Sequence, residues 1–276
     1  MPVINTNTSA QYAQDALKVN AKSMSSAMQQ LATGNRINAA RDDAAGLSMG
    51  QNMTSQVRGL NQAVRNTSDG INLLQTADGA LVETSNMLQR MRELAVQSSN
   101  STNSTSQRGY LNNEFKSLQD EITRVGNNTT WNNANVFGSV AATPLTLTFQ
   151  AGILSGQTIS VTLSAMDSTG LSVQGALASI GTFTAAQAAI TSIDAAIEIV
   201  NNGRSGMGAT MNQLSYSADN MTNISTNIAA SRSTIMDTDY ATASSQLSRA
   251  QIIQQAATAM LAQANQQPQS VLALLK

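Results

Sequence analysis

Apolar residues recur in steps of four and three along the last stretch of the chain, from Ala243 to Leu275. This spacing keeps one face of a helix turned toward a partner helix, as in a coiled coil. The residues on this stripe are Ala243, Leu247, Ala250, Ala257, Leu261, Ala264, Val271 and Leu275. Gln254 and Pro268 interrupt the stripe. Because proline lacks a backbone N–H, we expect the helix to end at Pro268.

A second apolar stripe lies beside the first and makes the apolar face wider than a two-stranded coil requires. It consists of Ile253, Ala256 and Met260. From Ala241 onward the only charged side chains are those of Arg249 and Lys276. A solvated helix face usually carries Lys and Glu, whereas an uncharged helix can be buried on several sides without desolvating ions. We therefore expect copies of this segment, or its neighbours, to surround it.

The first arm of the chain resembles the last arm in its chemistry. Its heptad stripe consists of Leu17, Ala21, Met24, Met28 and Leu31. Charged residues are again sparse, and Gly34–Asn35 gives a helix stop followed by a turn. The two arms are therefore predicted to be matching helices.

A very long helix is predicted after this break. Asp42 or Asp43 can cap it, and its apolar residues keep the heptad spacing to about Ser98. Some 50 helical residues at 1.5 Å each give a rod of roughly 75 Å. The glycines inside it, Gly59, Gly70 and Gly79, each cost about 1 kcal/mol relative to alanine. We interpret them as points of close packing.

Two further helices and a small β insert complete the pattern. A helix is predicted over about residues 107–125, and another begins near Ala185 and continues to a break at Met236–Asp239. Between them, Leu145–Phe149 and Thr158–Leu163 alternate apolar and hydroxyl side chains, which predicts a β-hairpin. Leu171–Val173 is a candidate for an additional short strand.

The order of these elements is nearly palindromic, so the predicted fold is mainly α: a long antiparallel helical hairpin, or coiled-coil bundle, with a small β-hairpin insert. We expect three parts. Residues 1–42 and 234–276 would pair as coiled-coil arms, residues 43–140 and 181–233 would form a helical rod, and residues 141–180 would form the β insert. On the arms, the side chains expected to make polymerisation contacts are Leu17, Met24, Met28, Leu31, Leu247, Ala250, Ile253, Ala257, Met260, Leu261 and Ala264.

Composition removes most catalytic functions from consideration. The 276 residues contain no histidine and no cysteine, so the commonest general base and metal ligand are missing, and thiolate chemistry is excluded. The net charge of -1 gives no basic stripe for nucleic acid. No secretory signal and no membrane span are expected from the hydropathy pattern. Only 11% of the residues are charged and 3% are aromatic, which favours long helices packed through small side chains over a thick core.

Two small motifs have more than one interpretation. Asp237 and Asp239 could hold a cation, but two carboxylates without further ligands are a weak site, and capping at a helix break is the better interpretation. Gly203, Gly206 and Gly208 do not have the spacing of a phosphate loop, so they are predicted to serve helix packing. We expect no metal and no cofactor.

Longer motifs then point to a family. Arg41–Ser48, Thr67–Leu81 and Gln89–Val96 resemble the amino-terminal region of bacterial flagellins. Gly208–Leu214 and Ser231–Tyr240 resemble their carboxy-terminal region. The resemblance covers residues 1 to about 137 and 185–276, and the insert between them is short. It implies a structural subunit that polymerises into the flagellar filament, with the arms innermost around a channel, the rod as the next shell and the insert outermost.

The resemblance also implies partners and a location. It implies export by the flagellar type III apparatus, a dedicated export chaperone, assembly under a cap protein, contact with hook-associated proteins, and a secreted, extracellular place in the flagellum. It further implies contact with Toll-like receptor 5 through Arg90, Leu94 and Glu114, in a patch that includes Gln89, Arg92 and Glu93. From residue types alone, this patch is an ordinary solvated helix face.

Three other functions are alternatives for this sequence. A hook–filament junction protein shares the terminal architecture, but the full set of motifs favours the filament subunit. An enzyme carried on the same scaffold is disfavoured, since a zinc protease needs His-Glu-x-x-His and the insert is too small for a catalytic domain. Immune recognition or adhesion would be a secondary role of exposed surfaces.

Overall fold

The fold is mainly α-helical with a small β component, as predicted. The computed structural model describes residues 6–137, 145–173 and 179–273, with only the backbone of 267–273. The helices in these ranges are α1 (Thr8–Thr33), α2 (Ala44–Ser98), α3 (Thr105–Asn128), α4 (Phe183–Met236) and α5 (Tyr240–Ala273). The strands are β1 (Thr130–Trp131), β2 (Ala134–Asn135), β3 (Leu145–Gln150) and β4 (Thr158–Leu163). Both predicted breaks are present, between α1 and α2 and between α4 and α5.

The chain divides into two compact units. Met1–Val57 with Thr226–Lys276 form one, which we call the terminal unit, and Arg58–Ser225 form the other, the central unit. Helices α2 and α4 have 55 and 54 residues and contribute to both units. At 1.5 Å per residue, each of these helices is roughly 80 Å long.

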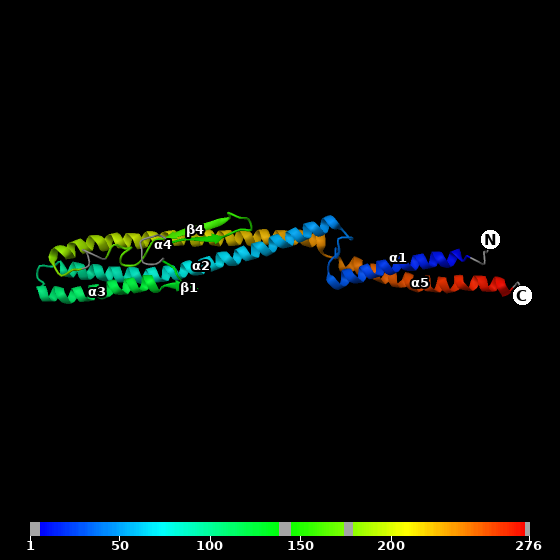
Figure 1. The fold of residues 1–276 in the computed structure, drawn as a ribbon, viewed down its shortest axis with the longest axis horizontal. Coiled ribbons are helices and arrows are strands. Elements are labelled where there is room, and N and C mark those ends of the chain that lie inside the picture. The colour runs from blue at the N-terminus through cyan, green and yellow to red at the C-terminus, as the bar shows by residue number, and fades with distance from the viewer. Residues whose placement is uncertain (1–5, 138–144, 174–178, 274–276) are drawn as a thin grey trace. The chain divides into compact units, whose positions relative to one another are not determined.

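Helices α2 and α4 lie side by side and antiparallel in the central unit (Figure 1). The order of their cross-helix polar pairs establishes the direction. Asn61 accepts a 3.0 Å hydrogen bond from Ser225, Asp78 forms an ion pair with Arg204 at 2.8 Å, and further along α2 the ion pair of Arg92 reaches back to Asp194 at 2.6 Å. As residue numbers rise along α2, those of the partners fall along α4. The predicted pairing of the outgoing and returning helices is therefore confirmed.

The core of the central unit is a continuous layer between these helices, α3 and the β-hairpin. Its larger buried side chains include Leu74, Leu81, Leu88, Met91, Phe115, Ile122, Leu163, Ile193, Val200 and Met207. Strands β3 and β4 pair antiparallel with Leu147 opposite Val161, and Val161 and Leu163 turn inward. The hairpin predicted from the two-residue period is thus confirmed, with its apolar face on the core.

Two of the three α2 glycines that were predicted to be packing points are sites of close approach. A Cβ on Gly70 would lie 2.9 Å from the Phe149 ring, and a Cβ on Gly59 would lie 2.9 Å from the Ile153 side chain. At these positions the absence of a side chain lets the hairpin lie against the helix. Gly79 has no neighbour within 4 Å of such a Cβ, so its predicted packing role is wrong.

The short strand predicted at Leu171–Val173 is not a strand. The segment is a turn in which the Leu171 and Val173 amides donate to the Asp167 and Ser168 carbonyls, and Ser172 has a φ of 55°. Leu171 and Val173 are both buried. The alternation of apolar residues reflects two anchors of a tight turn, and a turn and a short strand give the same pattern over three residues.

The backbone of α5 continues past Pro268 to Ala273, so the predicted end of the helix at this proline is wrong. Proline removes the N–H that would bond the carbonyl four residues earlier, that of Ala264. The Ala264 carbonyl instead accepts a 2.8 Å hydrogen bond from the Asn7 side chain. A donor from the other arm thus compensates for the missing helical bond. Leu275 and the side chain of Val271 lie outside the described residues.

Helix α4 is, by length and composition, apolar enough to cross a membrane, which differs from the expectation for the sequence. Its buried side chains include Ala186, Ile193, Val200, Met207 and Leu214. These positions recur at steps of seven, so they form one face, and that face belongs to the core of the central unit. Packing in a core accounts for the apolar composition of this helix.

Candidate functional site

The two arms, α1 and α5, pack along each other in the terminal unit (Figure 1). The more buried positions of α5 are Ala243, Leu247, Ala250, Gln254, Ala257, Leu261 and Ala264. These are the residues of the predicted stripe together with the glutamine that interrupts it. The seam contains four alanines and two leucines, so the helices approach closely and little apolar area is buried.

The seam of α1 is shifted by one residue from the predicted stripe at two positions. Asn20 and Ala27 are buried at 7% and 2% exposure, whereas Met28 is 48% exposed and Ala21 is also exposed. Leu17, Met24 and Leu31 lie in the seam as predicted. From Leu17 and from Met24, a step of three leads to Asn20 and Ala27, and a step of four leads to Ala21 and Met28. Both steps fit a heptad, and the prediction took the more apolar residue of each pair. It missed Asn20 because a buried amide requires a hydrogen-bond partner on another helix, which the sequence does not reveal.

An apolar face of the arms is exposed in the part of the chain that the structure describes. Ile252, Ile253 and Met260 on α5 are 66%, 43% and 65% exposed, and Ala256 between them is exposed as well. We call these four residues the outer stripe; it contains the predicted second stripe. Val19 and Met28 are similarly exposed on α1. Large apolar side chains grouped on a helix with almost no charge are typical of a protein–protein contact.

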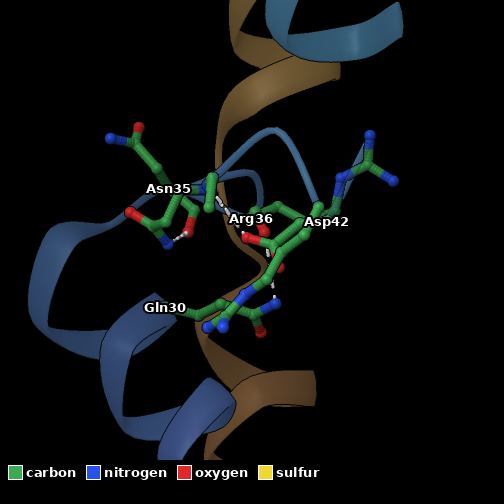
Figure 2. A network of polar contacts seen from close by, with 7 residues as sticks. Gln30, Asn35, Arg36 and Asp42 are labelled. Atoms are coloured by element: carbon green, nitrogen blue, oxygen red, sulfur yellow. Dashed lines mark hydrogen bonds and ion pairs between the residues drawn. The ribbon is translucent and has the colours of Figure 1, made fainter. Parts of the chain in front are cut away.

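Hydrogen bonds hold the two breaks between the arms and the long helices. Figure 2 shows contacts within the first break, where the Gln30 side chain donates to the Arg36 carbonyl at 3.2 Å. Helix α1 ends at Gly34, whose φ of 72° is left-handed and favours glycine. Arg36 donates its amide to the Met236 carbonyl at 2.7 Å and its guanidinium to the Ile235 carbonyl at 2.7 Å. The Thr238 amide donates to the Gly34 carbonyl at 2.9 Å. The two breaks in the chain are therefore tied together.

Asp239 caps the start of α5, as predicted. Its carboxylate accepts hydrogen bonds from the Thr242 hydroxyl at 2.8 Å and the Ala241 amide at 2.9 Å. These bonds favour the charged form and lower the pKa of Asp239. Because the pKa is lowered on folding, the stabilisation is present above the ordinary aspartate value of about 4 and is lost as the pH falls through the lowered value. Asp43 caps α2 in the same way, since it accepts from the Gly46 amide at 2.9 Å.

A charged patch on the central unit contains most of the residues expected to contact a receptor. Arg90 pairs with Glu93 and with Glu114 of α3, each at 2.9 Å. Hydrogen bonds to Glu93 and then to Glu114 raise the pKa of Arg90, and the bond to Asp194 raises that of Arg92. Gln89 is exposed beside them. The side chains of these ion pairs remain about half exposed, so each contributes little to stability.

Leu94 does not belong to this exposed patch. Its side chain is 1% exposed and packs in the core of the central unit. Asp194 of α4, by contrast, was not predicted and lies in the patch through its 2.6 Å contact with Arg92. Pairing across helices distant in sequence brings it there. A shallow surface depression of about 510 Å³ is lined by Gln89, Arg92, Glu93, Val96 and Gln97.

The described residues contain no group of three carboxylates that could hold a metal ion. A Cβ added to Gly203 would lie 2.8 Å from the Met166 side chain. A Cβ added to Gly206 or Gly208 would have no described atom within 4 Å. All three lie inside α4, so this segment is no phosphate loop, although packing is supported only at Gly203. What the geometry supports is a surface for association.

Comparison with known protein families gives two matches that together span most of the chain. The model of the bacterial flagellin N-terminal helical region matches residues 4–142. The model of the bacterial flagellin C-terminal helical region matches residues 190–275. The β-hairpin residues Leu145–Leu163 lie between the two matches.

Individual proteins match over nearly the full length. A flagellin of Halalkalibacterium halodurans is 44% identical over 274 residues, which cover 99% of this chain and 100% of that protein. Flagellin B of Vibrio cholerae is 33% identical over 371 residues, 99% of each chain. Among solved structures, Bacillus cereus flagellin is 32% identical with a TM-score of 0.49, over 61% of this chain and 94% of that chain.

Proposed function

The chain belongs to the bacterial flagellin family and is a structural subunit of the flagellar filament; from this premise we propose that its arms hold the subunits together. The family is one of structural proteins, so the chain is not an enzyme. Nothing in the comparisons favours a hook–filament junction protein. The observation that carries the proposal is the outer stripe, whose large apolar side chains stay exposed among the residues that the structure describes.

The outer stripe would be covered by neighbouring copies in the filament. Burying one Ile or Met side chain fully contributes about 1.5–3 kcal/mol, and every subunit presents the same residues. The few charges on α5 reduce the cost of surrounding it, because no row of ions needs to be desolvated. The seam residues would hold α1 and α5 as one unit while the outer stripe joins units.

The three parts of the chain would lie at increasing distance from the filament axis. Residues 1–42 and 234–276 would form the innermost shell, residues 43–140 and 181–233 the next, and residues 141–180 the outermost. The β-hairpin Leu145–Leu163 lies between the two family matches, as expected for an outer insert. The absence of cysteine suits export as an unfolded chain by the type III apparatus.

Several partners follow from this assignment. An export chaperone would keep the apolar arms from associating before export. A cap protein would direct the addition of subunits at the tip. Hook-associated proteins would provide the surface on which the arms of the first subunits bind. The assembled protein would lie outside the cell. Purified chain that is salted out should give long filaments in electron microscopy, whereas a junction protein would give none.

Replacing two residues of the outer stripe tests which surface joins the subunits. We expect the double variant Ile253→Ser, Met260→Ser to raise the critical concentration for polymerisation at least about 100-fold, since two buried side chains are lost. Sedimentation of the polymer against total protein measures this. Leu154→Ser is the matched control, because Leu154 is 62% exposed but lies beyond β3 in the central unit. Equal critical concentrations for both variants would refute the proposed surface.

The charged patch supports a second, recognition role. Arg90, held between Glu93 and Glu114, presents a fixed guanidinium at the surface, and such a group could meet Toll-like receptor 5. Leu94 would contact the receptor only after local rearrangement, since it is buried.

An Arg90→Ala variant tests this recognition role. We expect receptor signalling by the monomer to fall at least about tenfold, the effect of losing one well-formed charged contact. Arg65→Ala is the control, because Arg65 lies on the same helix and its guanidinium donates to the neutral Gln62 side chain. A receptor response to Arg90→Ala equal to that of the control would remove the role.

A further inference from the structure

The arm seam contains two asparagines that donate to the backbone of the opposite helix. Asn20 Nδ2 donates to the Ala250 carbonyl at 2.7 Å, and the bond is buried. Asn7 Nδ2 donates to the Ala264 carbonyl at 2.8 Å. The orientation of the Asn7 amide is fixed independently, because its Oδ1 accepts from the Ala10 amide at 3.0 Å and so caps α1. Both contacts run from α1 to α5.

The apolar seam by itself discriminates weakly between alignments of the arms. Along α5 it reads Ala, Leu, Ala, Gln, Ala, Leu, Ala from Ala243 to Ala264. If α5 slips by seven residues along α1, each alanine of this stretch is replaced by another alanine. Only the leucine and glutamine positions change places. The hydrogen bonds at Gly34 and Arg36 anchor one end of the pair. Beyond that end, shape complementarity in the seam leaves several alignments close in free energy, as in uniform coiled coils, where one buried polar residue can select a single alignment.

The polar contacts are spaced to select one alignment. Asn7 and Asn20 are separated along α1 by nearly the same number of residues as Ala264 and Ala250 along α5. The Ala264 carbonyl is distinctive because Pro268 cannot donate to it. A slipped alignment would leave this carbonyl without Asn7 and would bury the Asn20 amide against a different backbone position. Buried polar groups without partners are strongly disfavoured.

We propose that Asn7 and Asn20 are positioning residues that fix the register in which α1 pairs with α5 in the assembled filament, with Pro268 creating the acceptor for Asn7. The inference rests on the proposed function of the arms. It goes beyond that function, because polymerisation alone does not require a single register. A buried asparagine stabilises the helix pair less than an apolar residue would, but it can favour one alignment of the two helices over the others.

Disulfide trapping can read the register directly, because the chain has no cysteine of its own. By interpolation between the two asparagine contacts, Ala13 is level with Ala257. The native pair is Ala13→Cys with Ala257→Cys, and the slipped pairs join Ala13→Cys with Ala250→Cys or with Ala264→Cys. A heptad slip moves the partner by about 10 Å, beyond the reach of a disulfide. Intrachain cross-links are counted in filaments by peptide mapping.

The proposal predicts that filaments with both asparagines form the native cross-link almost exclusively. In Asn20→Leu and in Asn7→Ala, the ratio of slipped to native cross-links should rise at least about tenfold, as expected for the loss of one hydrogen bond between the arms. Gln14→Ala, an exposed change on the same helix, should leave the ratio unchanged. Native cross-links only, in both asparagine variants, would overturn the proposal.

A double-variant comparison separates register from simple destabilisation. Pro268→Ala restores a backbone donor for the Ala264 carbonyl, so adding Asn7→Ala to Pro268→Ala should change the cross-link ratio much less than Asn7→Ala does alone. Equal effects in the two backgrounds would overturn the role of Pro268. Should Asn20→Leu not polymerise, the Asn7 and Pro268 variants give the same readout. Failure of the proposed function would instead be visible in the parent chain, as an absence of filaments.

Discussion

Ala250→Asp should abolish filament formation while leaving the central unit folded. Ala250 is 4% exposed in the seam, and its carbonyl accepts the Asn20 amide. A carboxylate there would be buried between two helices without a cation, at a cost of several kcal/mol per subunit. The only charged residue described on α5 is Arg249, and its position next in sequence directs its side chain to another face of the helix. Electron microscopy after salting out measures the loss.

Two comparisons make the result specific. Ala250→Ser adds a small polar group without charge at the same position, and its filaments should remain long. Ala27→Asp places the same charge on the other arm, at a position 2% exposed, and should also abolish polymerisation. Circular dichroism of each monomer should match that of the parent chain. Filaments of normal length from Ala250→Asp would show that the seam is not buried in the polymer.

The arms of the dilute monomer should be cut by protease before the rest of the chain. Helix α1 buries only Ala10, Asn20 and Ala27, so its pairing with α5 removes little apolar area from water. Ordering costs about 1–2 kcal/mol of backbone entropy per residue, and most of the stability of a helix in a protein comes from tertiary packing, of which the arms have little. We therefore expect both arms to be disordered in the monomer and ordered in the filament.

Trypsin offers cleavage sites on both arms. In the monomer, cuts after Lys18, Lys22 and Arg249 should appear in minutes, at least about 100-fold faster than cuts at Arg204, which lies in the core-packed part of α4 and pairs with Asp78. In filaments the arm sites should become as slow as the central ones. Mass spectrometry of the fragments gives the rates. Arms that resist trypsin in dilute monomer would contradict this account.

Much of the fold could be predicted because it depends on periodicity. The α5 seam follows steps of four and three from Ala243 to Ala264. This pattern defines a single face of the helix, so the buried positions could be predicted. The β-hairpin likewise follows from alternation between Leu145 and Leu163. Helix ends were predictable at Gly34 and Asp239, where a single residue type satisfies the local backbone.

What the sequence did not reveal depends on contacts between distant segments. Asn20 in the seam requires the Ala250 carbonyl, and the continuation of α5 past Pro268 requires Asn7; both donors come from the other end of the chain. Asp194 reaches Arg92 only because α4 returns along α2. Leu94 was expected at the surface on the strength of resemblance, yet the heptad that includes Met91 and Leu88 turns it into the core.

We propose that in the filament α1 and α5 pair within one chain and the outer stripe meets neighbouring copies. A helical reconstruction of the assembled filament tests it most directly. We predict that Asn20 will lie against Ala250 of the same chain, with Ile252, Ile253 and Met260 buried against adjacent subunits. Arms that pair with those of another chain, or an outer stripe facing solvent, would contradict the account.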